Sequence, residues 1–215
     1  MGAIARAAAN NITTSGVFTS SAIANSSVTG ITALANASDG ITFISSQTAS
    51  NSASISFTSG LTSTYKAYKF VFSSIHPRTD AVYLTFQGST DGGSNYGVAI
   101  TNTVFQAYHY EDDSAAALQY QGSDDVAQST SFVAFVQPLN SDADQATSGT
   151  LQLFNPSSTT YVKHFITQFS NVHSADLAQN WFTAGYMNTT SAINAVQFKM
   201  DSGNMHGTIY LYGIK

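Results

Sequence analysis

The amino-acid sequence predicts an all-β protein, a two-sheet antiparallel sandwich that is jelly-roll-like and carries an extended N-terminal arm. From Ile41 onward, short stretches of alternating apolar and polar residues are separated by clusters of Gly, Asn, Asp and Ser, as in strands joined by turns. No segment beyond the arm repeats its apolar residues with the period of a helix. About a dozen short strands, spaced by turn signals in this way, favour a sandwich.

The first region in chain order is the arm, and the sequence predicts two parts, residues 1–40 and residues 41–215. The arm consists almost entirely of Ala, Ser, Thr, Asn and Gly with single aliphatic residues, and it has no acidic residue before Asp39. Alone it cannot bury enough surface to fold. A disordered tail is the alternative, but such tails usually carry more charge and proline.

The apolar residues of the arm recur every five or six residues, a spacing that fits neither a helix nor a lone strand. It suits an arm that lies across a neighbouring subunit and inserts one side chain at a time into shallow pockets. The predicted anchors are Ile12, Val17, Phe18, Ile23, Val28, Ile31 and Leu34.

The strands of residues 41–215 follow from the alternation. Tyr68, Phe70 and Phe72 share one face of a strand at 65–72, and they are predicted to be buried. A strand at 82–86 repeats the pattern. The other strands are expected from about Tyr96 and at 41–47, 53–58, 103–110, 116–121, 131–137, 149–155, 161–169, 180–187, 193–200 and 207–214.

The turn at residues 89–96 resembles the Asp-box pattern Ser-x-Asp-x-Gly-x-x-aromatic of sialidase-type propellers. It occurs once, whereas a propeller repeats its motif in every blade. Asp91 can bind backbone amides and the two glycines permit positive φ, so the segment is predicted to be a structural hairpin that leads into the strand at Tyr96. A calcium ion would require more carboxylates than this one.

The charge content narrows the class of protein. Charged residues make up 9% of the chain, against roughly 25% in soluble globular proteins. Surfaces buried in large assemblies often do without charge. The net charge is −5 and the basic residues are scattered, so no nucleic-acid partner is expected. No apolar run approaches the roughly 20 residues of a membrane helix, so no membrane partner is expected either.

Catalytic signals are sparse, and the sequence predicts a protein that is not an enzyme and has no metal or cofactor. The histidines lack zinc-site spacing, and no Gly-x-Ser-x-Gly occurs. Glu111, Asp112 and Asp113 could supply paired carboxylates for glycoside hydrolysis, or contact calcium or a partner, but their turn-like surroundings favour solvated loop residues. Trp181, with Tyr186 nearby, is a candidate platform for stacking on a sugar; core packing is the alternative.

Several phrases of residues 41–215, read together, resemble one family. They are Phe57–Gly60, Ser63–Tyr65, Ile75–Pro77, Phe86–Tyr96, Gly149–Pro156 and Ser202–Ile214. They are similar to the β-rich virion proteins of tailed bacteriophages of aquatic bacteria, including cyanophages, which are described as capsid decoration (cement) proteins, head fibres or tail fibres. The resemblance implies a component of a virus particle, and no catalytic motif comes with it.

We therefore expect a virion structural protein, made in the host cytoplasm and located on the particle exterior. As a homotrimer it would decorate the capsid and attach to the major capsid protein through its arm. The alternative is a tail or neck fibre module, bound to tail or neck proteins, that recognises a host receptor or surface glycan. A carbohydrate-active enzyme on the same fold is the third hypothesis.

Overall fold

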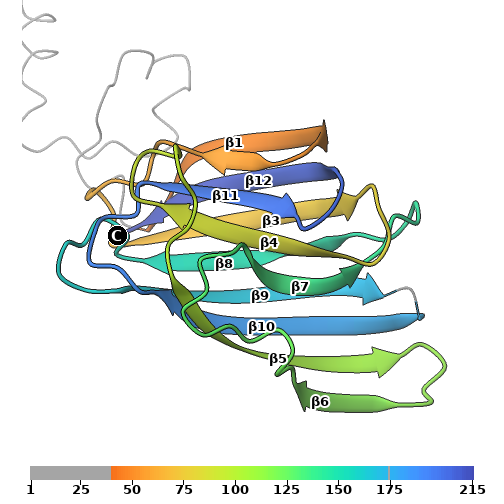
Figure 1. Cartoon of the computed structure of the whole chain (residues 1–215). Coiled ribbons are helices and arrows are strands. Elements are labelled where there is room, and N and C mark those ends of the chain that lie inside the picture. Colours follow the sequence, from red (N-terminus) through yellow and green to blue (C-terminus); the bar gives the residue numbers. More distant parts are fainter. Residues whose placement is uncertain (1–39, 174) are drawn as a thin grey trace, which may run out of the picture. The chain divides into compact units, whose positions relative to one another are not determined.

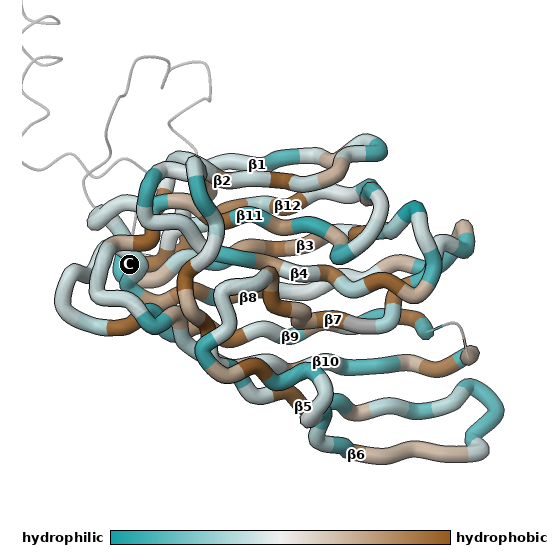
Figure 2. Tube along the Cα trace, viewed as in Figure 1, coloured by the Kyte–Doolittle hydropathy of each residue, from teal (hydrophilic) through white to brown (hydrophobic). Residues whose placement is uncertain are grey.

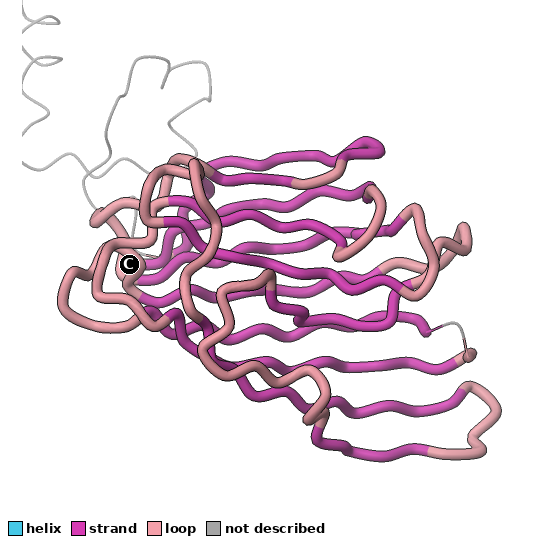
Figure 3. Tube along the Cα trace, in the orientation of Figure 1, coloured by secondary structure: helices cyan, strands magenta, loops and turns pink. Residues whose placement is uncertain are grey.

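The computed structural model describes residues 40–173 and 175–215, which form a sandwich of two antiparallel sheets (Figure 1). These residues contain twelve strands and no helix (Figure 3), so the predicted fold class is confirmed. The strands are β1 (Ile41–Ser52), β2 (Ile55–Phe57), β3 (Ala67–Pro77), β4 (Val82–Ser89), β5 (Ile100–Tyr110), β6 (Ala116–Tyr120), β7 (Val133–Leu139), β8 (Thr147–Phe154), β9 (Lys163–His173), β10 (Leu177–Met187), β11 (Ala195–Met200) and β12 (Met205–Ile214). The predicted arm anchors lie outside the described residues.

The strand order is that of a jelly roll with two inserted strand pairs. The larger sheet runs β1-β12-β3-β8-β9-β10-β5-β6, and the smaller sheet runs β2-β11-β4-β7. When β5–β6 and β9–β10 are left out, eight strands remain. In these, β1 pairs with β12, β2 with β11, β3 with β8 and β4 with β7. That pairing is a long hairpin wrapped into two sheets, as in a jelly roll. Both inserted pairs extend the same edge of the larger sheet.

Alternation of buried and exposed residues is typical of these strands. In β9, every second residue from Lys163 to Asn171 is buried and the residues between them are exposed. The predicted core faces are also present, since Tyr68, Phe70 and Phe72 of β3 are all buried. Figure 2 shows apolar residues recurring along the strands of both sheets.

The core between the sheets is built from aromatic rings. Phe198 of β11 packs against Phe70 at 5.1 Å and against Phe72 at 5.0 Å between ring centroids, both edge to face. Phe86 and Phe135 from the smaller sheet also contact Phe198. Each aromatic pair of this kind contributes about 0.5–1.5 kcal/mol beyond the burial of its surface.

The prediction of a hairpin at residues 89–96 is wrong. β4 belongs to the smaller sheet and β5 to the larger one, so the turn carries the chain from one sheet to the other. No strand begins at Tyr96, because residues 96–99 cross the edge of the sandwich without a strand partner. The next strand, β5, begins at Ile100 and is the one expected at 103–110. The Tyr96 ring is half-buried against Phe132, at 6.2 Å.

The far part of the larger sheet extends beyond the smaller sheet (Figure 1). β7, at the edge of the smaller sheet, packs over β9 and β10. The segment after β6 pairs with the first half of β5, where the Ile100 amide donates to Ser129 O at 2.8 Å and the Asn102 amide to Val126 O at 3.1 Å. The second half of β5, together with β6, therefore has an inner face that no strand of the smaller sheet covers.

Candidate functional site

The two aromatic residues proposed as a sugar platform are not brought together. Trp181 is in the core with 2% of its surface exposed, and its indole Nε1 donates to Gln179 Oε1 at 3.4 Å. Tyr186, five residues after Trp181 on β10, points to the opposite, outer face of the sheet. Its ring centroid there is 6.2 Å from that of His164. The structure therefore favours core packing for Trp181 over stacking on a sugar.

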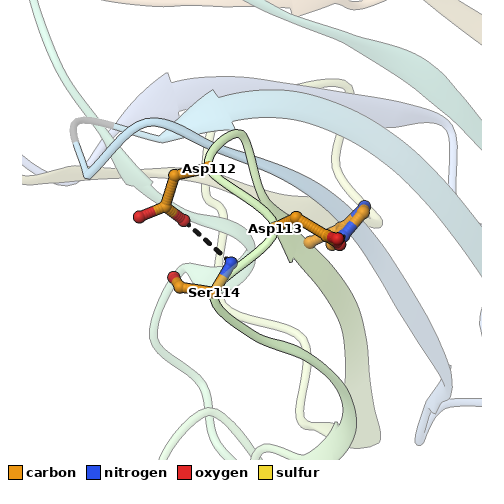
Figure 4. Close-up of polar contacts among 4 residues, drawn as sticks. Asp112, Asp113 and Ser114 are labelled. Carbon is orange, nitrogen blue, oxygen red and sulfur yellow. Dashed lines mark hydrogen bonds and ion pairs between the residues drawn. The ribbon is translucent and has the colours of Figure 1, made fainter.

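Glu111, Asp112 and Asp113 lie in the exposed turn between β5 and β6, as solvated loop residues would. Figure 4 shows Asp112 and Asp113 on this turn. The Ser114 amide donates to Asp112 Oδ1 at 2.9 Å. Hydrogen bonds from Ser114, first from its side chain and then from its amide, lower the pKa of the Asp112 carboxyl below its ordinary value.

Asp113 lies on the other side of this turn, and its carboxylate contacts His109 Nε2 at 2.9 Å (Figure 4). Asp113 adopts a positive φ of 60° at the turn. The two neighbouring carboxylates thus have separate partners that shape the turn, and they do not face each other as the acid pair of a glycosidase does.

The Asp124–Asp125 pair shapes the segment after β6. Asp125 Oδ1 accepts from the Val104 amide at 2.9 Å, and the Tyr120 hydroxyl donates to the same carboxylate. Burial, and then the neighbouring charge of Asp125, raises the pKa of Asp124. Within residues 40–173 and 175–215, no three His, Asp or Glu side chains gather closely enough to hold a metal ion. The same residues contain no helix able to span a membrane.

The outer face of the larger sheet is a surface that the sequence analysis missed. Across its eight strands the only charged residues are Lys69 and Lys163. Lys163 is fully buried, so the outer face carries Lys69 alone. A sheet face of this width normally relies on charge for solubility.

Large apolar side chains are exposed on this outer face. Phe105 of β5 stacks on Phe182 of β10 at 4.8 Å with an angle of 11° between the rings. Tyr120 of β6 pairs with Phe105, and Leu118 lies two residues away on the same face. Leu118 is 72% and Tyr120 66% exposed.

The exposed apolar residues continue across the sheet onto β9. Ile166 and Val172 on β9 are 53% and 43% exposed. Beside Ile166 lies a shallow depression of about 540 Å³, lined also by Phe154 and Tyr186. The signal in the sequence was the presence of apolar residues on both faces of one strand, as in Phe165 and Ile166.

These features define the class of protein as a jelly-roll sandwich with an extended large sheet, whose outer face is nearly uncharged. No protein-family model, no curated protein and no solved structure matches the chain.

Proposed function

We propose that the chain is a structural protein of a bacteriophage particle that decorates the capsid exterior. The observation that carries this proposal is the outer face of the larger sheet, which spans eight strands with one charged side chain and several exposed apolar ones. Exposed apolar patches of this kind mark surfaces that contact other proteins. The phrases that resemble virion proteins provide the second line of support.

In this proposal the two parts of the chain have different tasks. Residues 1–40 attach to the major capsid protein through the spaced anchors Ile12 to Leu34, and the outer face of the sandwich packs against a neighbouring subunit in a homotrimer. Each anchor buries a modest apolar area, worth about 25 cal/mol per Å². Joining three chains raises the effective concentration of every arm at its site.

The number of copies per particle tests the proposal. Mass spectrometry of purified particles should find the chain in stoichiometric proportion to the major capsid protein. A count of a few to some tens of copies would contradict capsid decoration. It would support the alternative, a tail or neck fibre module.

A binding experiment tests the two attachment elements separately. Purified chain is added to particles that lack it, and the bound fraction is measured by sedimentation. Deletion of residues 1–38 should abolish binding, and Leu118→Lys should lower it by placing a charge in the apolar patch.

The matched control is Gln119→Lys, on the same strand but pointing to the opposite face of the sheet. It should bind as the unchanged chain does. Full occupancy by the truncated chain would contradict the role of the arm. Equal binding by the two lysine variants would contradict the role of the outer face.

A further inference from the structure

The uncovered inner face at the far end of the larger sheet forms a groove. Two adjoining cavities of about 280 Å³ and about 230 Å³ lie along it, and both are lined by Gln106, Gln179 and His173. Tyr83 of β4 and Pro138 of the edge strand β7, both from the smaller sheet, line one end. Ligand sites for small molecules typically have volumes of roughly 300–1,000 Å³, a range that the two cavities reach together.

The floor of the groove contains three side-chain amides in a row, each at least nine-tenths buried. Asn171 Nδ2 donates to Gln179 Oε1 at 3.0 Å, and Gln179 Nε2 donates to Gln106 Oε1 at 2.9 Å. Asn171 is 3%, Gln179 7% and Gln106 9% exposed. These two hydrogen bonds fix the arrangement of the row, although Asn171 Oδ1 is buried without a partner among the described residues.

Two neighbouring groups, one that can only donate a hydrogen bond and one that can only accept, fix which way the side-chain amides of the row are oriented. The Trp181 indole N–H, which can only donate, points to Gln179 Oε1 at 3.4 Å. The Pro138 carbonyl, which can only accept, lies 3.5 Å from Asn171 Nδ2. The position of Gln179 Oε1 is therefore fixed as the acceptor from Trp181. Gln179 Nε2 then donates to Gln106 Oε1, which leaves the Gln106 nitrogen pointing away from Gln179. Among the described residues, nothing accepts a hydrogen bond from Gln106 Nε2, so a ready donor is left at the groove.

Other polar groups of the groove are also available to a ligand. His173 Nδ1 accepts from the Ala175 amide at 3.0 Å, which leaves the proton of a neutral ring on Nε2. Burial lowers the pKa of His173, which keeps this ring neutral at pH 7. Gln119 Nε2 approaches the Tyr108 hydroxyl at 3.5 Å, and its carbonyl oxygen has no partner within the described part of the chain.

Aromatic rings complete the wall. Tyr108 and Tyr110, two residues apart on β5, pack edge to face at 5.8 Å with an angle of 84° between them. Tyr83, 38% exposed, lies at the other end. No Asp, Glu, Lys or Arg is among the residues that line the two cavities.

From this geometry we infer that the groove binds a neutral oligosaccharide. Fixed amide donors and tyrosine hydroxyls match the paired donors and acceptors of sugar hydroxyl groups, and tyrosine rings offer apolar surface to the C–H faces of the sugar. The absence of charge from the lining disfavours sialylated, sulfated and phosphorylated ligands, which would be desolvated without a counter-charge. The inference holds for a decoration protein and for a fibre module alike.

The full-length chain can be tested on a printed array of neutral, sialylated and sulfated glycans, followed by isothermal titration with the neutral oligosaccharide that gives the strongest signal. Neutral glycans should bind, and anionic relatives of the same core should not. Gln106→Glu keeps an oxygen for Gln179 but replaces the outward donor with a charged acceptor, so the affinity should fall at least about tenfold.

Tyr110→Ala provides a second variant at the half-buried end of the groove, where loss of one ring leaves the core intact, and it should weaken binding to a similar degree. Gln168→Glu is the matched control, because Gln168 lies on the outer face of β9. It should bind normally. The inference is overturned if no neutral glycan binds the unchanged chain, if anionic glycans bind better, or if the control loses as much affinity as the groove variants.

Discussion

At the scale of single residues, Asp91 organises the crossing from the smaller to the larger sheet. Its Oδ1 accepts from the Ser89 hydroxyl at 2.6 Å and from the Asn95 amide at 2.9 Å, and its Oδ2 accepts from Asn95 Nδ2 at 2.7 Å. These bonds, first that of the Ser89 side chain, lower the pKa of Asp91 from 3.8 to about 2. The carboxylate is thus held ionised by the turn that it shapes.

Because of this lowered pKa, the free energy of unfolding of the sandwich should decrease at acidic pH. The ionised Asp91 stabilises the fold above its unfolded pKa of 3.8, and the contribution is lost as the pH falls from 3.8 toward about 2. Asp91→Asn should therefore be less stable at neutral pH and should lose less stability across that window. Urea unfolding at several pH values measures this difference.

The control for this experiment is Asp144→Asn, since the Asp144 carboxylate is exposed and accepts no hydrogen bond from the described residues. It should follow the unchanged chain at every pH. Parallel pH profiles for Asp91→Asn and the unchanged chain would show that the turn does not depend on the ionised carboxylate.

The exposure of a residue could be predicted from the sequence where it depends on neighbouring residues in the chain alone. The solvated acids at Glu111 to Asp113 were predicted because turn residues surround them. The buried row of Gln106, Gln179 and Asn171 was not, because alternation marks which residues share a face without saying that a polar one is buried. A glutamine on the core-facing side of two neighbouring strands was the only signal.

At the scale of elements, Gly149 of β8 leaves room for aromatic rings from the two neighbouring strands, β3 and β9, to meet. It pairs with Phe72 on one side and Phe169 on the other, and these two rings meet at 4.9 Å between centroids. A Cβ at Gly149 would come within 2.3 Å of the Gln168 backbone oxygen and within 2.5 Å of the Phe169 ring. The ring occupies the space that this glycine leaves.

Gly149→Ala should destabilise the fold by about 1–3 kcal/mol, because both the Phe169 ring and the backbone of β9 at Gln168 must shift to make room for the methyl group. Chemical denaturation gives the free energy of unfolding. Gly122→Ala is the control, since a Cβ there would meet only the Tyr120 ring at ordinary contact distance, and it should change stability by less than about 0.5 kcal/mol. An equal effect of the two substitutions would contradict the packing role of Gly149.

Every strand of the described residues was predicted, because a strand half-buried in a sandwich alternates and its ends carry turn residues. One further strand, expected from Tyr96, does not form. A Gly-Gly turn between two apolar segments favours a hairpin locally. Whether the chain then pairs with the strand it has left or crosses to the other sheet depends on the partners of both strands, which lie far away in sequence.

At the scale of the whole molecule, the described residues contain a core that both sheets build. The buried hydrophobic cluster runs from Ala49 to Leu211 and contains residues of both sheets. The chain divides into the units 1–39 and 40–215. A fragment of residues 40–215 therefore has its complete described core.

This fragment should unfold in one cooperative transition with the same midpoint as the full chain. Differential scanning calorimetry of both proteins compares the midpoints and the enthalpies. A fragment that aggregates, or that melts without a transition, would show that residues 1–39 are required for folding rather than for attachment.

The jelly-roll order has a consequence for how the protein can vary. β5–β6 and β9–β10 join the framework at the connections from β4 to β7 and from β8 to β11, so the pairing of the other eight strands does not depend on them. The row of buried amides that forms the floor of the groove lies on these inserted strands, whereas the phenylalanine core lies mainly between the other eight. A library that randomises the far ends of the inserted strand pairs can therefore be screened for binding to new ligands while the eight-strand framework stays unchanged.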